Sequence, residues 1–212
     1  TVKISGLIYG SGFQQGSVRS FLKRVVDISA ALLLLIVAAP IMLITAYVIH
    51  REGRGAVIYR QTRVGRNGET FTLLKFRSMC VNAEVNGEAQ WATENDSRVT
   101  PVGRWIRKTR IDELPQLFNV LRGEMSFVGP RPERPTFVDG LRQRIPFYDL
   151  RHTVKPGITG WAQVQYHYAA TADEAARKLQ FDLYYVKNNS LILDFMILLD
   201  TIRVVVSGDG AR

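Results

Sequence analysis

The run ISAALLLLIVAAPIMLITAYVI, residues 28–49, is the longest apolar stretch of the chain, and the rest of the fold must be arranged around it. Its roughly 22 residues reach the length that spans the hydrocarbon core of a bilayer. Pro40 lies near the middle of the run, where a proline removes one backbone hydrogen bond and clashes with the preceding turn. The sequence therefore predicts a long apolar helix that is kinked at Pro40.

Three interpretations of this run compete: a straight transmembrane span, a buried helix of a soluble protein, and a re-entrant (monotopic) helix that bends at Pro40 and returns to the same side. Buried soluble helices seldom run this long without a polar face. A spanning helix usually carries positive charge at one end only, so basic residues at both ends favour the re-entrant interpretation. These flanking residues are Lys23 and Arg24 before the run and His50, Arg51 and Arg54 after it. Each arm would be roughly 15–18 Å long.

Composition limits the class of protein. The chain has 212 residues, which suits one domain, and 46% of them are hydrophobic, which is too many for a disordered chain. The net charge of +9 indicates a polyanionic partner, such as nucleic acid, anionic lipid or a phosphorylated substrate. No signature of a nucleic-acid-binding fold is present, so we expect no nucleic acid. Cys80 is the single cysteine and excludes an internal disulfide.

The predicted fold is a helix-rich α/β (α+β) unit in three parts. Residues 1–20, rich in Gly and Ser, are expected to be a linker from a region that precedes Thr1, and residues 21–50 to form the membrane helix. Residues 51–212 are expected to form a domain at the cytoplasmic face of the membrane. Its apolar stretch near 191–206 contains Asp194, Asp200 and Arg203, which suits an amphipathic helix at the membrane interface, or a buried one, better than a span.

A β-hairpin is predicted in residues 56–79. Two β-rich runs there flank the pair Asn67-Gly68, which is a strong signal for a hairpin turn. Lys75 and Arg77 share one face of the second strand, opposite Phe76. An exposed, charged strand face explains these two cations as well as a functional role does.

Two adjacent acids stand in TRIDELP, residues 109–115, after a run of basic residues. Pro115 does not fit inside a helix, so a new helix is expected to start near Asp112. Asp112 and Glu113 would then lie in its first turn, where the helix dipole keeps the pKa of a carboxyl low. Such a carboxylate suits Mg²⁺ binding or attack on phosphorus. An ordinary charged helix start is the alternative.

The stretch FVGPRPERP, residues 127–135, predicts a stiff and extended turn, because its three prolines restrict the backbone. We expect this turn to aim Arg131 and Arg134 outward. A rigidly held arginine can bind phosphate through two parallel hydrogen bonds. Taken alone, the stretch is equally a plain proline-rich connection.

Together these motifs resemble the bacterial monotopic phosphoglycosyl transferases, the bacterial sugar transferase family. The resemblance runs in order from about residue 20 to the C-terminus, and the chain looks most like the catalytic end of the longer members. It is carried by K-R-x-x-D before the apolar run, Y-R-Q-x-R-x-G, L-K-F-R-S-M, D-E-L-P-Q-L-x-N-V-L-R-G-E-M-S-x-V-G-P-R-P and K-P-G-I-T-G-W-A-Q-V. Many members have Ser-Pro at the membrane kink, whereas this chain has Ala39-Pro40.

The resemblance implies an Mg²⁺-dependent enzyme of the bacterial inner membrane with its active site on the cytoplasmic face. Such enzymes transfer a sugar phosphate from a UDP-sugar to undecaprenyl phosphate and release UMP. This is the first membrane step in the assembly of exopolysaccharide, O-antigen or capsule-type glycans. The implied fold is a helix-rich α/β unit with a re-entrant helix in the lipid bilayer, and a homodimer is among the assemblies to be tested.

The resemblance also assigns roles to single residues. Asp112 would be the nucleophile that forms a phosphosugar–enzyme intermediate and would touch Mg²⁺, while Glu113 would assist the second half-reaction or the metal. The residues that match the family's phosphate- or substrate-binding positions are Lys75, Arg107, Arg131 and Asp182. Two rival functions stay open: a membrane-anchored scaffold that holds anionic lipid, and a glycosyl transferase that moves the sugar alone and releases UDP.

Overall fold

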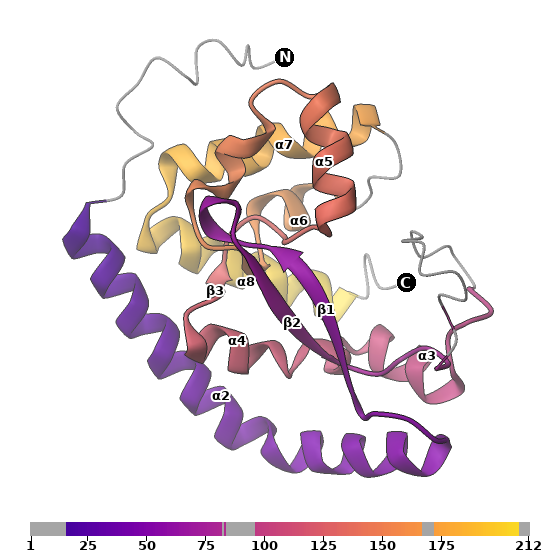
Figure 1. Ribbon diagram of the computed structural model, residues 1–212. Coiled ribbons are helices and arrows are strands. Elements are labelled where there is room, and N and C mark those ends of the chain that lie inside the picture. The colour runs from indigo at the N-terminus through magenta and orange to yellow at the C-terminus, as the bar shows by residue number, and fades with distance from the viewer. Residues whose placement is uncertain (1–15, 82, 84–95, 167–171, 208–212) are drawn as a thin grey trace.

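The computed structural model describes residues 16–81, 83, 96–166 and 172–207. It is helix-rich, with one long apolar helix at its N-terminal end and a short antiparallel hairpin, as the sequence predicts (Figure 1). The elements in chain order are α2 (Ser17–Glu52), β1 (Ile58–Val64), η2 (Arg66–Gly68), β2 (Thr70–Phe76), α3 (Pro101–Lys108), η3 (Ile111–Glu113), α4 (Gln116–Arg122), β3 (Ser126–Val128), α5 (Pro135–Arg144), η4 (Tyr148–Thr153), β4 (Gly157–Thr159), α6 (Trp161–Gln165), α7 (Ala172–Asn188) and α8 (Leu191–Ser207).

The first helix begins earlier than the sequence indicates. Residues 17–20, which the sequence analysis placed in a linker, are the first residues of α2. Residues 1–15 of the expected linker lie outside the described residues. The helix ends at Glu52, close to the predicted boundary at residue 50.

The predicted hairpin is confirmed. Strand β1 pairs antiparallel with β2, from Ile58 opposite Phe76 to Val64 opposite Thr70. Asn67 and Gly68 in the turn have φ angles of 56° and 81°, the left-handed conformation that asparagine and glycine adopt most easily. Leu73 and Phe76, which lie on opposite faces of β2, are both buried and pack in different apolar clusters, so the hairpin is anchored to the helices through both faces.

A second, parallel pair of short strands was not predicted. Strand β3 pairs with β4, with Ser126 opposite Gly157 and Val128 opposite Thr159. The two backbones come so close that a Cβ atom on Gly157 would lie 2.1 Å from the backbone nitrogen of Gly129. Glycine is therefore required at this position, and the close approach brings the loop after β3 next to the loop before β4.

Helix α2 exposes most of its apolar side chains. By length and composition it could cross a membrane, and in its most apolar stretch only 17% of the residues are buried. A core helix of a soluble protein would be mostly buried, so the observed exposure argues against that interpretation. Pro40 lies inside the helix, and Figure 1 shows that its first and last turns run in different directions.

The N-terminal third of α2 is fastened to the globular part by three polar side chains, those of Lys23, Arg24 and Asp27. Lys23 forms a 2.6 Å ion pair with Asp194 of α8. Arg24 donates hydrogen bonds to the carbonyls of Val120 and Leu121, in the last turn of α4, at 2.5 and 2.7 Å. The Val120 carbonyl also accepts from the backbone nitrogen of Gly123, so Arg24 and Gly123 together cap the end of α4.

The C-terminal end of α2 is fastened to the same globular part. Arg77, the residue after β2, donates to the carbonyls of Ile49 and Gly53, both at 3.0 Å. Glu52 accepts a 2.9 Å hydrogen bond from the backbone nitrogen of Val102 at the start of α3. Both ends of the apolar helix therefore contact one body, while its middle is exposed.

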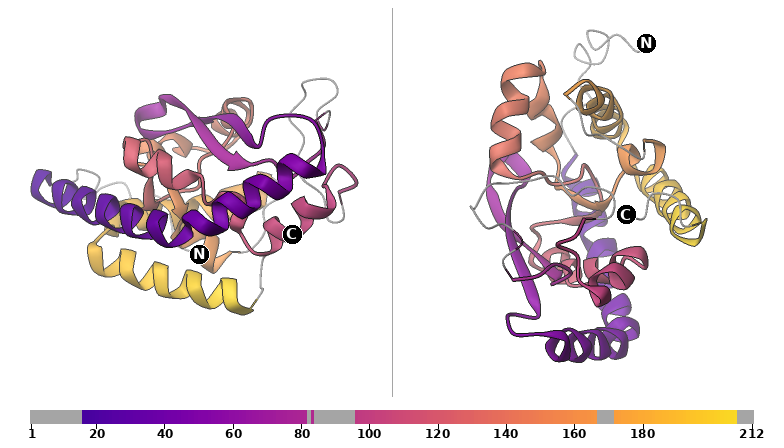
Figure 2. Two further views of the ribbon diagram at one scale, coloured as in Figure 1. Left: turned by 90° about the horizontal axis from the view of Figure 1, so that it is seen from below. Right: turned by 90° about the vertical axis from the view of Figure 1, so that its right-hand side faces the viewer.

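Helix α8 forms as predicted and carries an exposed apolar face. Ile192, Phe195, Leu199 and Ile202 recur at helical spacing and are 51–74% exposed. Asp194 does not interrupt this face, because it is buried and also accepts a 2.7 Å hydrogen bond from the Tyr185 hydroxyl. Both views in Figure 2 place α8 and the hairpin on opposite sides of the molecule.

We expect Asp27 on α2 to stabilise the fold through its acceptor atom. Asp27 is buried, and its Oδ1 accepts hydrogen bonds from the Ser126 hydroxyl at 3.0 Å and the Phe127 backbone nitrogen at 3.2 Å. Asp27→Ala leaves both donors without this partner and should lower the free energy of unfolding by about 1–3 kcal/mol, measured as thermal unfolding in detergent.

Asp27→Asn is the matched control, because asparagine keeps an acceptor oxygen at the same position. It should unfold closer to the wild type than the alanine variant does. Equal unfolding temperatures for the alanine variant and the wild type would contradict this role of Asp27.

Candidate active site at Asp112 and Glu113

The two adjacent acids lie on a tight turn between two helices. Helix α3 ends at Lys108, and Arg110 takes a left-handed conformation with a φ angle of 59°. A single 3-10 turn, η3, then carries Asp112 and Glu113, and α4 begins only at Gln116. Both acids do lie in the first turn of a helix that starts near Asp112, but that helix is a single 3-10 turn and not the start of α4. The left-handed residue instead turns the chain so that the acids face the hairpin.

Glu113 is held between two cations from distant parts of the chain. Its Oε1 accepts hydrogen bonds from Lys75 Nζ at 2.8 Å and from Arg131 Nη2 at 2.9 Å, and its side chain is only 11% exposed. Burial raises the pKa of Glu113, but the positive charges of Lys75 and Arg131 outweigh this effect and hold the pKa well below its usual range. Glu113 is therefore an ionised carboxylate whose negative charge is balanced by Lys75 and Arg131.

Asp112 has a different environment. It is buried, and no hydrogen bond or ion pair to its carboxylate is found within the described ranges of the chain. Burial raises the pKa of Asp112, the charge of Lys75 opposes that shift, and the neighbouring Glu113 adds to it. The sequence-based expectation of a low pKa from a helix dipole is thus wrong for Asp112, because loss of water dominates.

Lys75 and Arg77 both point into the molecule. Lys75 lies on β2, binds Glu113 and is 19% exposed in its side chain, and Arg77 binds the end of α2. Burial lowers the pKa of Lys75, and the charge of Glu113 counteracts this shift. The interpretation of this strand face as an exposed, charged surface is therefore wrong.

The Pro-Arg-Pro loop is fixed through its backbone carbonyls. Prolines have no N–H, so such a loop can be held by hydrogen bonds that its carbonyls accept. The carbonyl of Arg131 accepts from Arg151 Nη2 and that of Pro132 from Arg63 Nη1, both at 2.9 Å. The carbonyls on either side, Pro130 and Glu133, accept from the backbone nitrogens of Gly157 and Val64.

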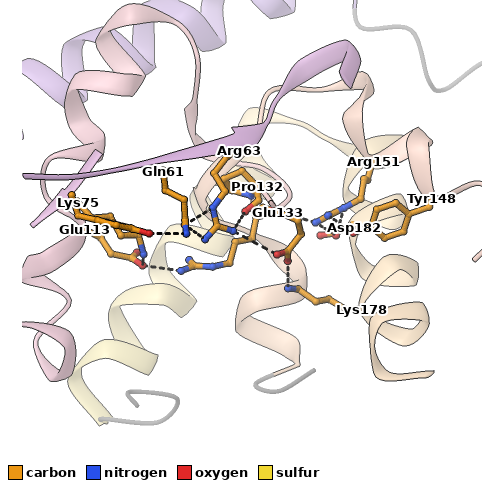
Figure 3. Close-up of polar contacts among 12 residues, drawn as sticks. Gln61, Arg63, Lys75, Glu113, Pro132, Glu133, Tyr148, Arg151, Lys178 and Asp182 are labelled. Carbon is orange, nitrogen blue, oxygen red and sulfur yellow. Dashed lines mark hydrogen bonds and ion pairs between the residues drawn. The ribbon is translucent and has the colours of Figure 1, made fainter. Parts of the chain in front are cut away.

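This fixed backbone sets the direction of Arg131. Its side chain extends to Glu113 instead of pointing outward, so the predicted outward orientation is wrong. Figure 3 shows the resulting row of polar side chains, which runs from Lys75 and Glu113 at one end to Arg151 and Asp182 at the other.

Asp182 lies behind this loop. It forms a 2.8 Å ion pair with Arg151, and the two side chains are 2% and 3% exposed. Arg151 also donates to the Tyr148 hydroxyl at 2.8 Å and to the carbonyl of Arg131 at 2.9 Å. In this structure Asp182 therefore contacts the arginine that holds Arg131, and its predicted contact with substrate stays a prediction.

Arg63 and Arg151 were missed by the sequence analysis. Their partners in the Pro-Arg-Pro loop lie 69 and 20 residues away along the chain. Arg63 belongs to the motif Y-R-Q-x-R-x-G, but the motif alone assigns it no role, and an arginine that binds a distant carbonyl looks like any other arginine in a basic sequence. Only the tertiary structure shows that both of them position the loop.

Arg107 lies near enough to Asp112 for its charge to act on that carboxylate. It is half-buried in the last turn of α3, and its charge lowers the pKa of Asp112. Within the part of the chain that the structure describes, its side chain makes no hydrogen bond or ion pair. Arg107 can therefore meet an anion that approaches Asp112.

The site suits a magnesium ion that is shared with a substrate. No cluster of three or more His, Cys, Asp or Glu side chains that could hold a metal occurs among residues 16–81, 83, 96–166 and 172–207. Mg²⁺ commonly binds through one or two carboxylates together with substrate phosphates. The Asp112 carboxylate fits that role because its oxygen atoms are not taken by other described groups.

Comparison with known proteins agrees with this site. The family model "Bacterial sugar transferase" matches residues 18–208. An N-acetylgalactosaminephosphotransferase acting with UDP-N-acetylgalactosamine and undecaprenyl phosphate, from Aeromonas hydrophila, is 53% identical over 91% of this chain and 45% of its own length. The undecaprenyl-phosphate glucose phosphotransferase of Komagataeibacter xylinus is 44% identical over 85% of this chain and 35% of its own.

A third relative is the UDP-glucose:undecaprenyl-phosphate glucose-1-phosphate transferase of Escherichia coli strain K12. It is 43% identical over 87% of this chain and 40% of its own length. The chain thus spans less than half the length of these three curated relatives.

We expect Asp182→Asn to destabilise the protein by about 3–5 kcal/mol, because it leaves the buried charge of Arg151 without its partner. Thermal unfolding measures this change. A double variant, Arg151→Met with Asp182→Leu, should lose much less stability than the sum of the two single variants. An Asp182→Asn protein of wild-type stability with a raised KM for one substrate would show direct substrate binding instead.

Proposed function

The chain belongs to the bacterial sugar transferase family, and on that premise we propose that it transfers a sugar 1-phosphate from a UDP-sugar to undecaprenyl phosphate and releases UMP. The observation that carries the proposal is the buried Asp112 carboxylate. It has no hydrogen-bond partner among the described residues and lies beside Glu113, whose charge is balanced by Lys75 and Arg131.

The electrostatics of the site favour two anionic substrates. A diphosphate and a lipid phosphate must both approach a carboxylate, which repels them. Lys75, Arg131 and Arg107 lie close enough to that carboxylate for their charges to oppose the rise in its pKa that burial causes. These positive charges offset the repulsion, and they act more strongly in a site with little water. The acidic pair in a protein of net charge +9 is thereby explained.

The proposed reaction has two displacements at one phosphorus atom. In the first, an oxygen of Asp112 bonds to the phosphorus that bears the sugar, and the bond from that phosphorus to the bridging oxygen breaks. UMP leaves with the electron pair. In the second, a phosphate oxygen of undecaprenyl phosphate bonds to the same phosphorus, and the bond to Asp112 breaks. The products are the sugar-diphosphate lipid and the restored Asp112 carboxylate.

The contacts support a division of labour that the sequence left open. A carboxylate that already accepts two charged hydrogen bonds is a weak nucleophile, and Glu113 is in that state. The Asp112 carboxylate accepts no hydrogen bond from the described residues, so we assign it the attack on phosphorus. Glu113 would position Lys75 and Arg131, and with them the phosphate that Asp112 attacks.

Magnesium would bind to Asp112 and to oxygen atoms of the substrate diphosphate. The ion would supply positive charge that stabilises the leaving phosphate of UMP. Arg107 and Arg131 would orient the same diphosphate through hydrogen bonds.

We further propose that α2 is a re-entrant helix, bent at Pro40, in the bacterial inner membrane, with the site at the cytoplasmic face. A straight helix of 36 residues would be about 54 Å long and would carry its two ends to opposite sides of a hydrocarbon core of about 30 Å. Contacts from one polar body to both ends of α2 fit a helix that returns to its own side. The exposed apolar face of α8 would then rest in the interface.

The Asp112→Asn variant should release no UMP above background, since an amide cannot form the intermediate. The assay measures UMP from a panel of UDP-N-acetylgalactosamine, UDP-glucose and UDP-galactose with undecaprenyl phosphate in nanodiscs, because relatives of the chain are named for different sugars. Asp139→Asn, which makes the same change at a side chain that is 69% exposed, should keep full activity.

Each other outcome excludes part of the proposal. UMP release by Asp112→Asn at the wild-type rate in a single turnover would overturn the role of Asp112. Release of UDP by the wild type would indicate a glycosyl transferase that moves the sugar alone. A wild type that releases neither nucleotide but binds vesicles of anionic lipid would indicate the scaffold.

Membrane topology can be tested by labelling single cysteines in a Cys80→Ser background. Ser17→Cys and Ala56→Cys place one exposed cysteine at each end of α2. Both should react with an impermeant maleimide from the cytoplasmic side only, as seen in spheroplasts and inverted vesicles. Labelling from opposite sides would show that α2 spans the membrane.

A further inference from the structure

A cavity of about 240 Å³ lies beside Glu113, between the apolar helix and the core of the protein. Its wall is formed by α2, the η3 turn, α4, the parallel strand pair, α6 and α8. Ala38 lines it from α2, Leu117 from α4, Ile158 from β4 and Thr201 from α8. The cavity thus begins at the proposed active site and runs along the inner face of the membrane helix.

The lining of this cavity is mostly apolar, although it includes Gln163, whose buried Oε1 accepts no hydrogen bond from the described residues. Its two threonine hydroxyls satisfy each other, because Thr159 Oγ1 and Thr201 Oγ1 are 2.7 Å apart and Thr201 donates to the carbonyl of Ile197 at 2.7 Å. Leucine, isoleucine, valine and phenylalanine side chains supply most of the remaining wall. A nucleotide-sugar would leave its many hydroxyl groups without partners here, so the cavity suits a hydrocarbon.

The volume limits the length of hydrocarbon that fits. A cavity of about 150 Å³ holds one benzene molecule, with six carbon atoms. An isoprene unit has five, so about 240 Å³ accommodates about one or two isoprene units. This is less than the roughly 300 Å³ at which whole-ligand pockets begin, as expected for a cavity that binds only the start of a longer chain.

The lining of the cavity includes both charged and exposed apolar side chains. Arg110 and Glu113 are its charged members, and Glu113 is already paired with Lys75 and Arg131. Leu34 also lines the cavity and is 43% exposed, so the rim reaches the surface of α2. The exposed apolar residues of α2 continue from that rim.

We propose that this cavity, which we call the prenyl pocket, holds the first isoprene units of the polyprenyl phosphate acceptor. The phosphate would lie beside Arg110, next to the reacting Asp112, and the rest of the chain would leave past Leu34 into the bilayer. The inference rests on the proposed function, because it locates the acceptor of that reaction. Charged groups next to the proposed nucleophile suit the phosphate, and an apolar wall with an exposed rim at Leu34 suits the hydrocarbon chain.

Ala38→Leu tests the pocket by filling it. Ala38 is 8% exposed and lines the cavity, so a leucine there takes space from the acceptor. The KM for undecaprenyl phosphate should rise about tenfold, the size of effect that follows when an aliphatic group can no longer be buried. Single-turnover UMP release from the UDP-sugar without acceptor should stay at the wild-type level, because that step uses no lipid.

Ala39→Leu is the matched control. It makes the same change one residue further along, at an exposed position of the same helix that does not line the cavity. Its KM for the acceptor should equal that of the wild type. An unchanged acceptor KM in Ala38→Leu, with wild-type turnover, would overturn the prenyl pocket and leave the proposed function intact.

A second measurement needs no substitution in the pocket. A polyprenyl phosphate with a diazirine in its first isoprene unit should crosslink to wild-type protein within residues 34–38, 110–117, 127, 158–164 or 201–204. Crosslinks confined to other segments would also overturn the pocket. If the wild type releases no UMP from any UDP-sugar with acceptor present, the proposed function itself fails, and the pocket as an acceptor site fails with it.

Discussion

The ion pairs that Glu113 forms with Lys75 and Arg131 are the interaction on which the site depends. They join the hairpin, the η3 turn and the Pro-Arg-Pro loop at the side chains of the site, in addition to the backbone contacts that hold the loop against β1. They also occupy Glu113, whereas the neighbouring Asp112 takes part in neither ion pair. Asp112 is buried beside the same cations but takes no hydrogen bond from the described residues, so its oxygen atoms are available to a metal or a phosphorus atom.

Attachment of both ends of α2 to one body gives this site a defined depth. Lys23, Arg24 and Asp27 hold the first part of the helix, and Arg77 and Glu52 hold its end. Most apolar side chains in the middle of α2 are exposed on the surface of the protein. In the proposed reaction this arrangement matters, because a polyprenyl phosphate cannot leave the bilayer and the carboxylate must lie where its headgroup lies. The prenyl pocket would connect the two regions.

The sequence predicts the elements whose signals are local. Asn67-Gly68 locates the hairpin, the long apolar run locates α2, and the stretch near 191–206 locates α8. It does not predict β3 and β4, because strands of three residues carry too little pattern. The candidate acids were found from their motif, but their environments were not. Burial of Asp112, the inward direction of Arg131 and the contacts of Arg63 and Arg151 all arise from residues distant in sequence.

The covalent intermediate on Asp112 can be observed directly. The protein is incubated with its UDP-sugar and Mg²⁺ without any polyprenyl phosphate, quenched, and analysed by intact-protein and peptide mass spectrometry. We expect a mass increase of one sugar phosphate on the peptide that contains Asp112, and its disappearance when undecaprenyl phosphate is added before the quench. Full turnover with acceptor but no adduct without it, or an adduct on a peptide that lacks Asp112, would contradict the proposed mechanism.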